Sequence, residues 1–205
     1  MRREPRIISL GPGDLARTVA LHDRCSPQTL WSRYHRAMAD PRTYLPDLLS
    51  RAGSVHLAAQ DTTGRIVAVG HLMPDNAAAE AALLAEDSWQ GRGLGTRLLR
   101  HLGRHALTGG WATLYGLFQS GDERIEAILH HVDVPVHRRQ EDGAVTAWAH
   151  VDDLAAGTAS APVPVGSGGG SGRAAGAGGG PHRRLLMPWR RGTGRPRTPR
   201  TPGSP

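Results

Sequence analysis

The sequence predicts an α/β or α+β layered domain built around a mixed sheet, and two observations lead to this prediction. Apolar segments with strand or helix spacing follow one another in the order strand, helices, three strands, helix, strand, helix and two strands. Turn-forming residues separate these segments as far as about residue 154, where the pattern ends.

Capping residues predict the first two helices. Asp14 is placed to cap a helix that runs to about Arg24, after a short strand over residues 6–10. Ser26 followed by Pro27 supplies the N-cap and the first position of a second helix.

The next segments predict strands. Ser54–Gln60 and Arg65–Met73 alternate in hydropathy around a turn at residues 61–64, which is typical of a hairpin. Glu80–Asp87 reads as a third strand that runs directly into a glycine-rich loop, Gln90–Gly95. The remaining predicted elements are a helix, a strand, a helix and a hairpin, over Thr96–Leu107, Trp111–Gln119, Glu123–Val132, and Val134–Arg139 with Ala144–Val151.

The C-terminal quarter of the chain differs sharply in composition. The formal net charge is +7, yet residues from Thr158 onward contain arginines and no acid, so the preceding part is close to neutral. Glycine-, proline- and arginine-rich sequence cannot bury enough apolar surface to offset its conformational entropy. We therefore expect a folded domain over residues 1–157 and a disordered tail over 158–205. The tail's arginines could attract nucleic acid, but no pattern of interleaved aromatic residues supports specific recognition, and an inert extension is favoured.

The rest of the composition favours a cytoplasmic protein with no membrane association. The N-terminus has no long apolar run of the kind found in signal peptides, and no segment reaches the roughly 18 apolar residues that a membrane span needs. The single cysteine, Cys25, excludes an internal disulfide, and no His or Asp is placed to activate it as a nucleophile. His101 and His105 have helical i, i+4 spacing without a third ligand, so no metal site is expected.

The glycine-rich loop is the segment most informative about function. Gly91, Gly93 and Gly95 lie where a predicted strand passes into a predicted helix. Glycines let the backbone approach an anion closely, and the helix N-terminus offers free N–H groups and the positive end of a dipole. Together these features predict a phosphate cradle made of main-chain donors.

Two common phosphate-binding motifs fit this loop poorly. A P-loop requires a lysine, and the chain contains none. A dinucleotide fold requires Gly-x-Gly-x-x-Gly and an acid about 20 residues later on the next strand. Here the spacing is Gly-x-Gly-x-Gly, and the next acid, Asp122, stands at a predicted helix start.

The loop resembles motif A of the GNAT superfamily of N-acetyltransferases, Gln/Arg-x-x-Gly-x-Gly/Ala, with Gln90, Gly93 and Gly95 at the matching positions. The resemblance extends over about residues 5–154. It implies a GNAT-like, mostly antiparallel central sheet flanked by helices, with acetyl-CoA or another acyl-CoA as co-substrate. It also implies that main-chain N–H groups hold the CoA pyrophosphate while the pantetheine arm pairs with the neighbouring strand. The implied cofactor-binding residues are Leu83, Ala85, Gln90, Gly91, Arg92, Gly93, Leu94, Gly95 and Thr96. For Arg92 and Arg97, solvated helix-start charges are an equal alternative.

A narrower resemblance concerns catalysis. Residues 24–34 and 79–83 resemble the acetyltransferase domain of bacterial Pat-type protein lysine acetyltransferases, which implies that Glu80 is the general base. The amine acceptor arrives as an ammonium, so a base must remove a proton before the amine attacks the thioester. Glu86 and Asp87 are second choices for this role, and a solvated strand-end acid is the plain alternative for Glu80. The resemblance also implies that a main-chain N–H near Ala85 stabilises the oxyanion.

The sequence departs from the superfamily pattern near its last helices. Many relatives have a tyrosine acid after the last helix, where this chain has none, and Tyr115 lies on the preceding strand and receives no role. Asp122 stands where relatives often have Asn, and Asp133 and Val134 stand in place of Gly-Phe. The sequence thus supports cofactor binding more strongly than full catalytic competence.

Three functions fit these patterns. The first is an N-acyltransferase acting on a small-molecule amine or a protein lysine. The second is a catalytically weak acyl-CoA-binding sensor or adaptor. The third is a nucleic-acid-associated protein that works through its basic tail. The acceptor pocket is expected within about residues 24–50, whose sequence specifies neither acceptor nor acyl chain.

Overall fold

The structure is a computed structural model that describes residues 4–35 and 40–156 of the 205-residue chain. The predicted tail, residues 158–205, lies outside the described residues, and so does the predicted domain boundary.

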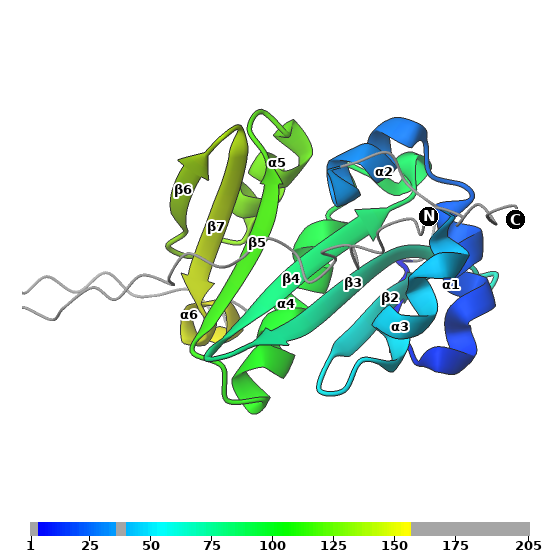
Figure 1. Ribbon diagram of the computed structural model, residues 1–205, viewed down its shortest axis with the longest axis horizontal. Coiled ribbons are helices and arrows are strands. Elements are labelled where there is room, and N and C mark those ends of the chain that lie inside the picture. The colour runs from blue at the N-terminus through cyan, green and yellow to red at the C-terminus, as the bar shows by residue number, and fades with distance from the viewer. Residues whose placement is uncertain (1–3, 36–39, 157–205) are drawn as a thin grey trace, which may run out of the picture. The chain divides into compact units, whose positions relative to one another are not determined.

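The described residues alternate strands and helices as predicted, with every predicted strand present (Figure 1). The strands are β1 (Arg6–Ser9), β2 (Val55–Gln60), β3 (Ile66–Asp75), β4 (Ala78–Ala85), β5 (Thr113–Gln119), β6 (His137–Glu141) and β7 (Ala144–His150). The α-helices are α1 (Leu15–His22), α2 (Pro27–Tyr34), α3 (Leu45–Ser50), α4 (Leu94–Thr108), α5 (Glu123–His131) and α6 (Val151–Ala156). Short 3-10 turns are η1 (Pro12–Asp14), η2 (Pro41–Thr43) and η3 (Asp87–Trp89).

The strands form one sheet, which among the described residues has seven strands in the order β1-β2-β3-β4-β5-β7-β6. Every neighbouring pair is antiparallel except β4 and β5. The prediction of a mixed, mostly antiparallel sheet flanked by helices is therefore confirmed.

Helices cover both faces of the sheet (Figure 1). On one face α4 presents leucines at i, i+4 spacing, and the fully buried Leu98 and Leu102 pack against Val67 and Leu72. On the other face Leu21 of α1 packs with Val69 and Leu84. Because side chains alternate along a strand, even-numbered residues of β4 face α1–α3 and odd-numbered ones face α4.

Several boundaries differ from the prediction. Helix α4 begins at Leu94 and not at Thr96, so Gly95 lies in the helix, and β6 spans His137–Glu141 and not residues 134–139. Strand β4 ends at Ala85 rather than at Asp87, and η3 separates it from the glycine loop, so the strand does not run directly into the loop. The reason is that the side chains of Glu86 and Asp87 bind Arg24 after α1, Arg65 before β3 and Ser26 at the N-cap of α2, and these contacts turn the chain there. Helix α6 was not predicted, since Val151 reads as the end of a strand but is buried in the cluster under α4.

The predicted N-cap at Ser26 is confirmed, because its Oγ accepts a hydrogen bond from the Thr29 N–H at 3.2 Å. Asp14 precedes α1 as predicted, but its carboxylate binds the Gly11 N–H and Arg17 instead of a helical N–H. In the described part of the chain, no helix combines the length and apolarity of a membrane span.

Buried histidines lie on the α1–α3 side of the sheet. His56 and His71 are 4% and 1% exposed, and their Nδ1 atoms share a hydrogen bond of 2.9 Å. His22 binds the Thr18 carbonyl and the Tyr34 hydroxyl. Burial lowers the pKa of all three, most strongly that of His71, so the fold holds them neutral.

These histidines predict acid destabilisation. The unfolded chain takes up protons near the ordinary pKa of 6.5 that the folded chain does not, so the free energy of unfolding falls as pH decreases through that value. Each such histidine contributes a slope of up to about 1.4 kcal/mol per pH unit. Urea denaturation between pH 7.5 and 5 should show the loss, which the double variant His56→Leu/His71→Leu should reduce. Replacing the exposed His130 with leucine should leave the slope unchanged, and a slope equal in all three proteins would contradict the assignment.

Candidate active site

The three glycines of the loop have two different structural roles. Gly91 and Gly93 have φ angles of 67° and 73°, in the left-handed region, and a Cβ at either position would meet open space. Gly93 is the N-cap of α4. A Cβ on Gly95 would lie 2.4 Å from Cδ1 of Ile128, so this glycine permits the close approach of α4 and α5. The first two glycines therefore shape the turn, and the third serves packing.

The loop presents a row of unpartnered main-chain donors. The first hydrogen bond at this end of α4 runs from the Arg97 N–H to the Gly93 carbonyl at 3.0 Å. No described residue accepts a hydrogen bond from the N–H groups of residues 91–96. These groups stand at the positive end of a 15-residue helix, which is the arrangement that binds phosphate groups.

The two arginines near the loop are held differently. Arg97 donates to the Pro5 carbonyl at 3.1 Å and forms an ion pair with Glu4, which directs its side chain toward the N-terminal segment. Arg92 is exposed, and its guanidinium lies 5.0 Å from the centre of the Trp89 ring. Of the two, only Arg92 stands beside the loop without an ion-pair partner among the described residues.

Among the described residues, no strand pairs with the β5-facing edge of β4 beyond Glu80. Strands β4 and β5 pair only from Ala78↔Thr113 to Glu80↔Tyr115, after which β5 continues beside β7 and the two strands diverge (Figure 1). The Glu86 N–H bonds the Val67 carbonyl, so by the alternation of antiparallel ladders the main-chain groups of Leu83 and Ala85 point away from β3. The main-chain groups of Leu83 and Ala85 therefore point toward the β5 side of β4, where β5 no longer pairs with β4.

The side chain of Gln90, which was predicted from motif A, forms hydrogen bonds within the protein. Its Nε2 donates to the Ala85 carbonyl and to Thr29 Oγ1, both at 3.0 Å. Thr29 also donates to Asp87, at 2.8 Å. Gln90 thus ties the loop to the end of β4 and to α2, and it shapes the site without pointing its amide at the donor row.

Glu80 lies on the face of β4 that carries α1–α3, opposite Met73 of β3 and Tyr115 of β5. Its side chain is half-buried. Burial raises the pKa of its carboxyl; the charges of Arg33 and Arg51 oppose the rise, and that of Asp75 adds to it. A carboxyl with raised proton affinity beside the point where β4 and β5 diverge is suited to act as a base.

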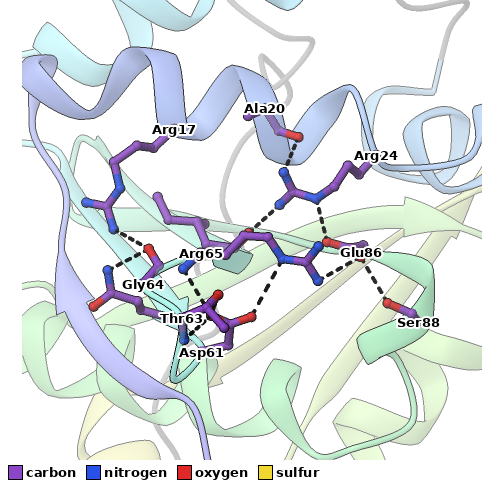
Figure 2. A network of polar contacts seen from close by, with 11 residues as sticks. Arg17, Ala20, Arg24, Asp61, Thr63, Gly64, Arg65, Glu86 and Ser88 are labelled. Atoms are coloured by element: carbon purple, nitrogen blue, oxygen red, sulfur yellow. Dashed lines mark hydrogen bonds and ion pairs between the residues drawn. The ribbon is translucent and has the colours of Figure 1, made fainter.

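The second-choice bases are engaged elsewhere. Glu86 is 8% exposed, and its carboxylate binds Arg24 at 2.8 Å, Ser88 at 3.0 Å and Arg65 at 3.5 Å (Figure 2). Asp87 accepts hydrogen bonds from the N–H and Oγ of Ser26 and from Thr29. Both carboxylates fasten the end of β4 to neighbouring elements, which leaves Glu80 as the better candidate.

The Arg24–Glu86 pair predicts a large stability effect. Arg24 also donates to the carbonyls of Ala20 and Ile66, so it joins α1 to β3 and β4 (Figure 2). Arg24→Leu leaves the buried Glu86 charge with weaker partners and should lower the free energy of unfolding by about 2–4 kcal/mol. Arg138→Leu removes an exposed pair with Glu126 and should cost less than about 1 kcal/mol. Equal urea midpoints for the two variants would refute the role given to Arg24.

Two further residues have structural roles. Cys25 is buried, and burial raises the pKa of its thiol to about 12, which keeps it protonated and unreactive. Asp122 caps α5 by accepting the Arg124 N–H at 3.1 Å, and it also accepts a hydrogen bond from Ser32 of α2. Asp122 therefore performs a capping role, and its carboxylate also forms an ion pair with Arg124.

Comparison with known proteins agrees with this geometry. A family model described as the Acetyltransferase (GNAT) family matches residues 18–124, just over half of the chain. The chain belongs to this family of acetyltransferases. A search of curated proteins found no significant match.

Solved structures of the family share the fold. The GNAT domain of S. lividans PAT superposes with a TM-score of 0.64 at 20% identity, covering 71% of this chain and 90% of that one. A phosphinothricin acetyltransferase from Sinorhizobium meliloti, in complex with AcCoA, superposes with a TM-score of 0.58 at 12% identity, covering 78% of this chain and 93% of that one. A ribosomal-protein-alanine N-acetyltransferase from Brucella melitensis superposes with a TM-score of 0.55 at 15% identity, covering 71% of this chain and 99% of that one.

Proposed function

We propose that this protein is an N-acyltransferase that transfers an acetyl or short acyl group from acyl-CoA to an amine, on a small molecule or a protein lysine. The observation that carries the proposal is the row of unpartnered N–H groups over residues 91–96 at the start of α4, next to the unpaired edge of β4. Family membership supports the same reaction, and the S. meliloti neighbour was solved in complex with AcCoA.

In this proposal the CoA diphosphate lies against the main chain of residues 91–96, where the helix dipole favours negative charge. The pantetheine arm extends along β4 as an additional strand, with its amides paired to main-chain groups near Leu83. The alternation of the ladder supports this, because the groups of Leu83 point away from β3. The thioester is thereby brought toward the place where β4 and β5 diverge.

Glu80 then serves as the base. It takes a proton from the acceptor ammonium, directly or through water, and the free amine attacks the thioester carbon. The new C–N bond gives a tetrahedral oxyanion, and the C–S bond breaks when this oxyanion collapses. CoA leaves as a thiolate, which takes up the second proton that the attacking nitrogen loses, directly or through water. A main-chain N–H on the outward-facing edge of β4 is the proposed oxyanion donor.

A thiol-release assay tests the proposal most broadly. The full chain is incubated with acetyl-CoA and a panel of small amines, amino acids and lysine peptides, and free CoA is followed with a thiol reagent. We expect acceptor-dependent release with at least one class of amine, and mass spectrometry should find the acetyl group on nitrogen. If the protein bound CoA but released no free thiol with any acceptor, the proposed enzymatic activity would be overturned and an acyl-CoA sensor would be favoured.

A further inference from the structure

A second carboxylate and a phenol stand beside Glu80, on elements distant in sequence. Tyr115 of β5 pairs in parallel register with Glu80 of β4, at the last position before the strands diverge. Asp75 ends β3, and its Oδ2 accepts a hydrogen bond from the Tyr115 hydroxyl at 3.0 Å. The other carboxylate oxygen lies 3.3 Å from Nδ2 of Asn76. The Asp75 carboxylate is therefore held from two sides.

The single proton of Tyr115 is committed to Asp75. Tyr115 is 5% exposed, and burial, followed by the nearby Glu80 charge, raises the pKa of its phenol well above the ordinary value. The phenol stays protonated and has one hydrogen to donate. Because Tyr115 donates that hydrogen to the Asp75 carboxylate, it has none to donate to Glu80. Tyr115 is thus unsuited to protonate the leaving thiolate, and it acts as a brace instead.

Three charged groups around the site act on Glu80. Arg33 of α2 and Arg51, which follows α3, favour its ionised form. Asp75 of β3 opposes them, and the phenol of Tyr115 on β5 is neutral. The segment after Arg51 contacts the strand that carries Asp75, since a Cβ on Gly53 would lie 3.2 Å from Pro74. Asp75 is therefore the negative charge in this set that strengthens proton binding by Glu80.

We propose that Asp75 and Tyr115 are positioning residues for Glu80: the Tyr115 hydroxyl, which lies beside Glu80 in the β4–β5 register, fixes the Asp75 carboxylate on the face of the sheet that carries Glu80, two residues along β3 from the partner of Glu80. The inference rests on the proposed function of Glu80 as base. Neither residue contacts the acyl-CoA in this arrangement, and both act through Glu80.

The direct test is an NMR titration of the Glu80 side-chain carboxyl in the full chain, without CoA or acceptor, with the resonance assigned by loss in Glu80→Gln. Asp75→Asn removes the negative charge and keeps a side-chain oxygen that can accept from the Tyr115 hydroxyl, so the pKa of Glu80 should fall. Tyr115→Phe releases the Asp75 carboxylate to turn toward solvent, and a smaller fall is expected. Asp47→Asn on α3 removes one negative charge outside this set and Tyr44→Phe removes another buried phenol; both should leave the titration of Glu80 unchanged.

Kinetics give a second readout that a purely structural role would not produce. Asp75→Asn should move the acidic limb of the kcat profile to lower pH and reduce its plateau roughly three- to tenfold, because a weaker base accepts the proton less readily. An unchanged Glu80 titration in Asp75→Asn would overturn the inference. If that variant does not fold, an unchanged titration in Tyr115→Phe would do so. Since the titration needs neither CoA nor acceptor, its outcome is separate from whether the chain catalyses acyl transfer.

Discussion

Replacing Glu80 with glutamine is expected to lower kcat about 10²- to 10⁴-fold while the Kd for CoA stays within about twofold of the original value. Glutamine keeps the shape of the side chain and removes its basicity. Glu80 lies on the α1–α3 face of β4, whereas the donors proposed for CoA are main-chain groups of the loop and strand edge. Loss of the base should therefore leave the cofactor site intact.

The measurement is steady-state kinetics with the best acceptor, paired with calorimetric titration of CoA into each variant. Glu123→Gln, an exposed acid in the first turn of α5, is the matched control and should keep full activity. Retention of kcat in Glu80→Gln would remove Glu80 from the mechanism. A parallel loss of CoA affinity would instead indicate a structural role.

Replacing Gly93 with valine is expected to weaken CoA binding by at least about tenfold, since a β-branched residue in the left-handed region costs about 1–3 kcal/mol. Open space surrounds a Cβ at this position, so the effect comes from the backbone angle of 73° and not from a clash. To relieve the strain the loop must change its φ and ψ angles, and the N–H groups would then no longer converge.

Gly13→Val is the control for this variant, because Gly13 also has open space around a Cβ and its φ lies outside the left-handed region. Calorimetry with CoA and a thermal melt should be run on both proteins. Undiminished CoA affinity in Gly93→Val would mean that the turn does not form the anion site.

Local signals in the sequence predicted much of this fold. The Ser26–Pro27 helix start, the β2–β3 hairpin and the glycines of the α4 N-terminus depend on neighbouring residues and on backbone angles, which sequence patterns report well. The end of β4 was wrong by two residues, because the partner of Glu86, Arg24, is 62 positions away. Helix α6 was missed because Val151 continues the alternation of β7 while tertiary packing turns it under α4.

The candidate site divides along the same line. The glycine loop could be proposed from residue types and spacing, and Glu80 from the resemblance to Pat-type acetyltransferase domains. The Asp75–Tyr115 hydrogen bond joins residues 40 positions apart and depends on the register of β3, β4 and β5, which no local pattern encodes. The hydrogen bonds of the Gln90 side chain to Ala85 and Thr29, and the ion pair of Arg97 with Glu4, likewise could be identified only from the three-dimensional structure.

Calorimetric titration of CoA and of pantetheine into the full chain tests the diphosphate site most directly, because the two ligands share the pantetheine arm and only CoA carries the diphosphate, with the 3′-phosphoadenosine attached to it. We expect CoA to bind with a Kd of roughly 1–100 µM and pantetheine at least about tenfold more weakly, since the N–H row at the start of α4 has no anion to bind in the second case. No heat from CoA at millimolar concentration, or equal affinity for both ligands, would contradict the proposal that the loop at residues 91–96 grips a diphosphate.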